Sequence, residues 1–134
     1  MNLTRVYFDK ELEMGEYLLV ETTSPTVSFR YKDLASCSAI VFKCERGFAG
    51  FHYPAQVLLS SYAEYSKEMI KMIKYIEQGL GKINSVRCFT PKPLFDDCNV
   101  DKDICAIENF FEDYNFELVE SIKDVSTEIY FQKL

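Results

Sequence analysis

Two apolar runs separated by only two polar residues constrain the fold of this chain more than any other feature. Residues 39–44 read AIVFKC and residues 47–53 read GFAGFHY, with Glu45 and Arg46 between them. A two-residue link between strand-like runs is typical of a β-hairpin. Because both runs are apolar at nearly every position, both faces of this hairpin must be covered. We therefore expect the hairpin to lie in the interior of a sheet.

The remaining segments predict further strands and two helices. Apolar residues at spacings of 3 and 4 after Pro54, from Tyr62 through Met69 and Met72 to Leu80, predict a long helix that Gly79 and Gly81 end. We interpret its methionines as core, with a Met-rich binding face as the alternative. A shorter helix is predicted at 104–114. The further predicted strands are 17–21, 27–31, 83–89, 116–120 and 127–132.

Length and element order together predict the fold class. The chain has 134 residues, which is the size of one compact domain, so we expect a single domain over residues 1–134. Short links between strands favour antiparallel pairing. The predicted fold is α+β, a mainly antiparallel sheet with one long and one short helix packed on it.

Charge and hydropathy exclude several classes of partner. The net charge is −6 and no cluster of Lys and Arg stands out, so we expect neither nucleic acid nor an anionic membrane surface as a partner. No run of 18 apolar residues predicts a transmembrane helix. The charged first 19 residues lack the apolar core of a signal peptide, which favours the cytoplasm. A protein or a small molecule remains as the partner, and the oligomeric state stays open.

The five cysteines favour free thiols. Their number is odd and none forms a C-x-x-C pair, which argues against a disulfide framework and for a reducing compartment. Zinc ligands lie closer together than Cys88, Cys98 and Cys105 do. The acidic segment 90–103 lacks the central Gly and the terminal Glu of a calcium loop. We therefore predict no metal and no other cofactor.

The only histidine, His52, ends the second run of the hairpin. Any Cys–His enzyme in this chain must use it as the base that takes the thiol proton. If Glu45 and Arg46 form a two-residue turn, Ala39 lies opposite His52 and Cys37 becomes the diagonal neighbour of His52 on the same face. A three-residue loop would slip this register by one residue. The alternative is a buried thiol near an ordinary, half-buried imidazole.

Small residues beside this pair are candidates for the rest of a site. Backbone N–H groups at Ala35 and Ser36, directly before Cys37, are candidates for an oxyanion hole. Tyr53, the last residue of the second run, and Gln56 beyond it border this site and are candidates to line a substrate groove.

The stretch LASCSAIVFKCERGFAGFH resembles the Cys–His core of the CheD-type glutamine deamidases, whose pattern is approximately L-G-S-C-V-A-V, a short turn and a run that ends in His. Leu34, Ser36, Cys37 and Ala39 match, and Ala35 stands in place of Gly. The stretch is also similar to the toxin deamidases typified by the cytotoxic necrotizing factor catalytic domain and the Burkholderia lethal factor, which carry L-S-G-C. The order of predicted elements after His52 matches as well.

The resemblance implies a necrotizing-factor-like fold in which Cys37 is the nucleophile and His52 the base. The family places a Thr six residues before the cysteine as the third catalytic member, and this chain has Tyr31 there. The orienting group of His52 is then Tyr31, Ser28, Thr26 or a main-chain carbonyl. The glycine pairs that follow the long helix and precede the last strand in the family are also missing, which favours a divergent branch.

The function that the resemblance implies is deamidation of an exposed glutamine on a partner protein. A divergent branch fits a bacterial effector that is delivered into the cytosol of a target cell. Two alternatives stay open: a catalytically silent interaction module on the same fold, and a thiol protease or acyltransferase that uses the same dyad.

Overall fold

The computed structural model describes residues 2–32, 34, 37–54, 62–91, 106–122 and 127–132, with the side chains of 62–65, 90–91, 120–122 and 127–132 excepted. Predicted features at Ala35, Ser36 and Gln56, and in the segment 92–105 with Cys98 and Cys105, lie outside the described residues.

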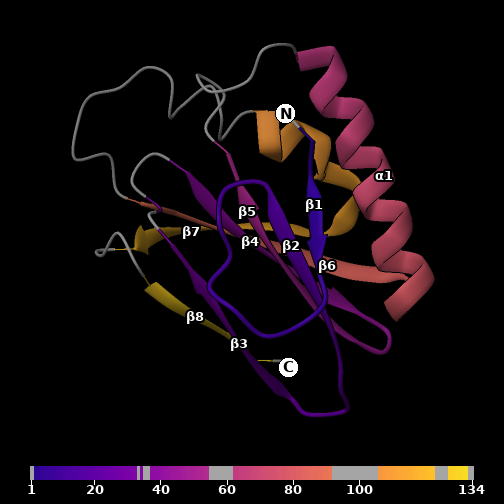
Figure 1. Cartoon of the computed structure of the whole chain (residues 1–134), viewed down its shortest axis with the longest axis vertical. Coiled ribbons are helices and arrows are strands. Elements are labelled where there is room, and N and C mark those ends of the chain that lie inside the picture. Colours follow the sequence, from indigo (N-terminus) through magenta and orange to yellow (C-terminus); the bar gives the residue numbers. More distant parts are fainter. Residues whose placement is uncertain are drawn as a thin grey trace.

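A six-stranded sheet forms the centre of the fold (Figure 1). The hairpin predicted from the two apolar runs supplies its two middle strands, and nearly every residue in them is buried. The first and last pairs of the sheet are parallel, and the three pairs between them are antiparallel. The α+β prediction is therefore confirmed. In spatial order the strands are β1 (Thr4–Val6), β2 (Glu16–Glu21), β5 (Gly47–Tyr53), β4 (Ser38–Cys44), β6 (Ile83–Pro91) and β7 (Phe116–Ile122).

A separate two-stranded ribbon consists of β3 (Thr26–Tyr31) and β8 (Thr127–Gln132). Although β3 follows β2 after a short link, it pairs with the last strand of the chain instead of continuing the six-stranded sheet. Its side chains alternate between exposed and buried, with Val27, Phe29 and Tyr31 turned inward. This alternation is the pattern of a strand that covers a core on one face only.

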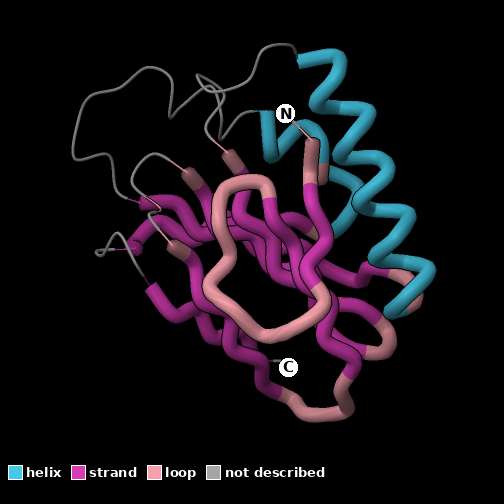
Figure 2. The backbone as a smooth tube through the Cα atoms, in the orientation of Figure 1, coloured by secondary structure: helices cyan, strands magenta, loops and turns pink. Residues whose placement is uncertain are grey.

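Helix α1 (Tyr62–Leu80) and the β3–β8 ribbon lie on opposite faces of the sheet (Figures 1 and 2). One buried cluster joins Met69, Met72 and Ile76 of α1 to Phe42 and Phe51 of the sheet. The methionine stripe is therefore core, as predicted. A second cluster joins the inward residues of β3 to alternate residues of the same central strands. Successive side chains of a strand point to opposite sides, so α1 covers one face of the hairpin and β3 covers the other.

Helix α1 ends at a glycine with positive φ, and short helical segments later in the chain complete the helix layer. Gly81 ends α1 at φ +82°, and its N–H donates to the carbonyl of Glu77 at 2.9 Å. Gly79, predicted to share this role, lies inside the helix. Residues 106–110 are helical and lead into η2 (Glu112–Tyr114). Phe111 between them packs edge-on against Phe42, with ring centroids 5.5 Å apart. Within the described residues, no helix is both long and apolar enough to cross a membrane.

Candidate active site

The register of the β4–β5 hairpin sets the positions of the candidate dyad. Glu45 and Arg46 form the two-residue turn, Cys44 pairs with Gly47, and Ala39 pairs with His52. This is the register that the two-residue link predicted. Cys37 precedes Ala39 by two residues and immediately precedes β4, so the register makes it the diagonal neighbour of His52.

Cys37 and His52 lie on the sheet face that β3 covers. Cys37, Ala39 and Tyr31 belong to the buried cluster on that face. The side chain of His52 is fully buried, and Cys37 is 5% exposed. The N–H of Cys37 donates to the carbonyl of Leu34, which closes a tight turn before β4. Because this N–H is used inside the turn, it is not the donor that an oxyanion hole would need.

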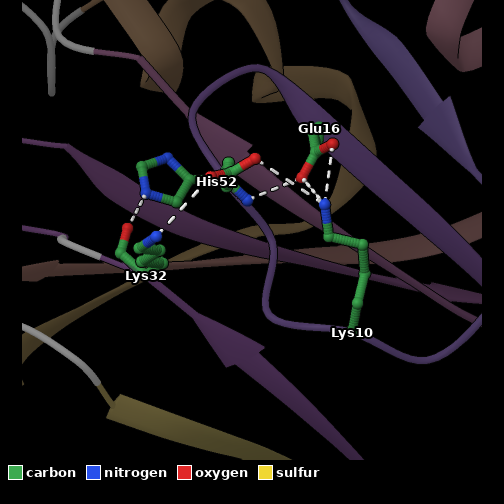
Figure 3. A network of polar contacts seen from close by, with 5 residues as sticks. Lys10, Glu16, Lys32 and His52 are labelled. Atoms are coloured by element: carbon green, nitrogen blue, oxygen red, sulfur yellow. Dashed lines mark hydrogen bonds and ion pairs between the residues drawn. The ribbon is translucent and has the colours of Figure 1, made fainter.

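The imidazole of His52 is oriented by a main-chain carbonyl. Its Nε2 lies 2.8 Å from the carbonyl oxygen of Lys32 (Figure 3). A carbonyl oxygen only accepts, so Nε2 carries the ring hydrogen in the neutral form and donates it to Lys32. The basic nitrogen is then Nδ1, which is also buried. This is the tautomer that a general base at Nδ1 requires.

The segment before β2 holds both Lys32 and His52 through its backbone. The N–H of Lys32 donates to the carbonyl of Leu12 at 3.0 Å, and the N–H of Leu12 donates to Arg30 at 2.8 Å. Gly15, at φ +84°, donates its N–H to the carbonyl of His52 at 2.9 Å. One loop therefore holds His52 in two ways. It fixes Lys32, whose carbonyl orients the imidazole, and it binds the main-chain carbonyl of His52 through Gly15.

Charged side chains on the surface join the same loop to Lys32. Nζ of Lys10 lies 2.9 Å from a carboxylate oxygen of Glu16 and 3.7 Å from Glu13 (Figure 3). Glu13 in turn lies 3.7 Å from Nζ of Lys32, and both of these side chains are more than half exposed. Pairs this exposed contribute little to stability. The backbone hydrogen bonds, not the ion pairs, hold the carbonyl of Lys32 in place.

Tyr31, one of the candidates to orient His52, contacts it through its ring. The ring centroids are 6.1 Å apart, and the hydroxyl of Tyr31 donates to the carbonyl of Ile40 at 3.0 Å. Burial raises the pKa of this hydroxyl, so it stays a donor. Thr26 and Ser28 lie on the exposed side of β3, away from the sheet. Tyr53 packs in the cluster under α1, on the face opposite His52.

Replacing Tyr31 with Phe separates the stabilising hydrogen bond of its hydroxyl from the orientation of His52. We expect Tyr31→Phe to lower the free energy of unfolding by about 1–3 kcal/mol, because a buried carbonyl loses its donor. The rate of alkylation of Cys37 at pH 6–8 should stay within about twofold of the parent, because Lys32 still orients His52. Urea denaturation and mass-spectrometric mapping of alkylated cysteines measure the two effects. A loss of Cys37 reactivity at unchanged stability would assign the orienting role to Tyr31 instead.

The two other described cysteines are buried on the opposite face. Cys44 and Cys88 belong to the cluster under α1. Burial raises the pKa of each thiol to about 12, so both remain protonated at neutral pH. Cys37, Cys44 and Cys88 are not joined in disulfides. Within the described part of the chain, only Cys37 shares a face with His52, and no three His, Cys, Asp or Glu side chains gather as a metal site.

Comparisons with protein-family models and with curated proteins give no match to this chain.

The sequence pattern pointed to Cys37 and His52 but not to Lys32. Every residue has a carbonyl, so no side-chain pattern marks the one that accepts from a histidine. Gly15 is the one weak signal for the loop that holds Lys32, since a glycine between Met14 and Glu16 fits a turn with positive φ.

Proposed function

We propose that the protein is a thiol-dependent amidohydrolase that deamidates a glutamine side chain of a partner protein, with Cys37 as nucleophile and His52 as base. The observation that carries the proposal is the hydrogen bond from Nε2 of His52 to the carbonyl of Lys32. It leaves Nδ1 as the basic nitrogen of a residue one diagonal step from Cys37 on the same sheet face. The resemblance of the Cys37 segment to CheD-type deamidases supports glutamine as the substrate group.

The proposed reaction has two halves. His52 takes the proton from the thiol of Cys37, and the sulfur bonds to the side-chain carbonyl carbon of the glutamine. The C–N bond then breaks, and the departing NH₂ group takes the proton from His52 to leave as ammonia. Water attacks the resulting thioester while His52 accepts one of its protons. The C–S bond breaks, the thiol of Cys37 is restored, and the product is a glutamate.

Isotope labelling tests this reaction while the substrate protein is still unidentified. Bacterial and mammalian cell lysates are incubated with the protein in water enriched in ¹⁸O, and tryptic peptides are then sequenced by mass spectrometry. We expect glutamines at specific sites to become glutamates that carry one ¹⁸O, since water supplies the new oxygen. The Cys37→Ser variant controls for spontaneous deamidation. Labelled sites that are equally abundant with this variant would contradict the proposal.

A second candidate is an interaction module without catalysis. It is favoured by the burial of the pair, since His52 is fully buried and Cys37 is only 5% exposed. In this case Cys37→Ser would leave binding of a partner intact and the labelled proteome unchanged. Cleavage of peptide bonds in the same experiment, with ¹⁸O at new C-termini, would instead assign a thiol protease.

A further inference from the structure

A groove of about 570 Å³ lies between edge strand β1 and helix α1, on the sheet face opposite Cys37 and His52. β1 contributes Arg5, followed along the chain by Tyr7, and α1 contributes Glu68, Lys71 and Tyr75. Tyr7 and Tyr75 are exposed residues, at 76% and 47% of their full surface. Two exposed tyrosines and an arginine beside one groove are typical of a protein-recognition site, because Tyr and Arg contribute much of the binding energy at protein interfaces.

Arg5 is the charge in this groove that has no counter-ion among the described residues. Its Nε is buried and has no hydrogen-bond partner in the described part of the chain, and none of the carboxylates there forms an ion pair with it. The guanidinium carbon lies 4.7 Å from the ring centroid of Tyr7, a cation–π contact that orients the group without neutralising it. Glu68 lies 3.8 Å from Nζ of Lys71. With those two charges balanced, the groove keeps one net positive charge.

The main chain of Arg5 is also open at this edge. Among the described strands, β1 has a neighbour on one side only, and it pairs with β2 in parallel. The N–H of Thr4 donates to the carbonyl of Gly15, so the main-chain N–H and C=O groups of Thr4 point toward β2. Successive residues of a strand direct their N–H and C=O groups to opposite sides, so those of Arg5 point outward. One residue thus offers a backbone donor, a backbone acceptor and a guanidinium at the same edge.

We propose that β1 and the groove beside it bind an extended segment of a partner protein as an added strand, with an Asp or Glu of that segment opposite Arg5. Residues directly opposite in a strand pair share a face, so the carboxylate enters the groove when the backbones pair at Arg5. The guanidinium then forms a charge-assisted, bidentate contact. Because the groove and the Cys37 face are separated by the sheet, this site does not depend on the proposed catalysis.

A matched set of short peptides tests the proposal. The probes are acetyl-TVEVT-amide, its glutamine analogue acetyl-TVQVT-amide, and acetyl-TVQVT with a free C-terminal carboxylate. Binding is followed by NMR at the Nε–H resonance of Arg5 and by hydrogen exchange at the Arg5 amide. We expect the glutamate peptide to bind at least about tenfold more tightly than the glutamine peptide, in line with a charge-assisted bond. The Arg5 amide should become protected in the wild-type protein.

Variants test whether Arg5 causes the preference for the glutamate peptide. Arg5→Gln should remove the preference for glutamate, and Arg5→Lys should keep only part of it because the planar fork is lost. Arg30→Gln is the matched control, since Arg30 already lies 3.4 Å from Asp9. Equal affinities of the two amidated peptides, or no binding at millimolar concentration, would overturn the proposal. Tightest binding by the free C-terminal peptide would overturn the choice of an internal acidic residue. The exchange measurement on wild type stays decisive if an Arg5 variant fails to fold.

Discussion

Alkylation of Cys37 at pH 6 should slow about 100-fold when His52 is replaced by Ala, the lower range of what a general base contributes. In the parent protein, His52 takes the thiol proton, so Cys37 should react with iodoacetamide well below pH 8. Without the imidazole, Cys37 should react only at higher pH, because a thiol without a base stays mostly protonated near neutral pH. The rate is measured for each cysteine separately, by mass-spectrometric mapping between pH 5.5 and pH 9.

The experiment contains its own controls. Cys44 and Cys88 have their pKa values raised to about 12 by burial, so both should stay unreactive throughout this pH range if the variant is folded. His52→Gln adds a second control, because an amide N–H replaces the donor to Lys32 without supplying a base. If Cys37 reacts with one pH profile in all three proteins, it is a buried thiol without a catalytic partner. The interaction module would then become the leading function.

The central hairpin was predictable because its information is local. The two-residue turn at Glu45 and Arg46 fixes the register, and apolar residues on both faces place the hairpin inside the sheet. Helix α1 was predictable from its apolar stripe for the same reason. Local periodicity identifies such elements whatever they pack against.

The partners of the outer strands could not be predicted in this way. β1 has three residues, too few for a periodic signal, and it pairs in parallel with β2 across a gap of nine residues. β3 has a clear alternation, but nothing in its sequence says that it pairs with β8 near the other end of the chain. β3 leads directly to Lys32. Because the position of β3 could not be predicted, the carbonyl that orients His52 could not be predicted either.

Gly50 is the sequence feature that permits β3 to approach the site. A Cβ at this position would lie 2.5 Å from Cδ1 of Phe29, so it would overlap with a ring that packs over the central strands. Ring atoms of a buried Phe on a paired strand have little room to move. The absent side chain therefore sets how closely β3, and with it Lys32, lies to the strand that carries His52.

We expect Gly50→Ala to lower the free energy of unfolding by about 1–3 kcal/mol, the usual cost of overpacking a core. It should also slow alkylation of Cys37 at pH 6, because displacement of β3 moves the carbonyl of Lys32 away from Nε2. In the background of Phe29→Leu, which removes part of the ring, the same substitution should cost less. A double-mutant cycle by urea denaturation should therefore show a favourable coupling of about 1–2 kcal/mol.

Gly79→Ala is the matched control for this cycle. The added Cβ there would lie 2.7 Å from Cδ2 of Leu19, the far end of a flexible side chain. Because Ala favours a helix interior over Gly by up to about 1 kcal/mol, we expect Gly79→Ala to be neutral or stabilising. Additive losses for Gly50→Ala and Phe29→Leu would contradict the close approach of β3 to β5. Unchanged Cys37 reactivity in a destabilised Gly50→Ala would show that the position of β3 does not control the base, and the carbonyl of Lys32 would lose its assigned role.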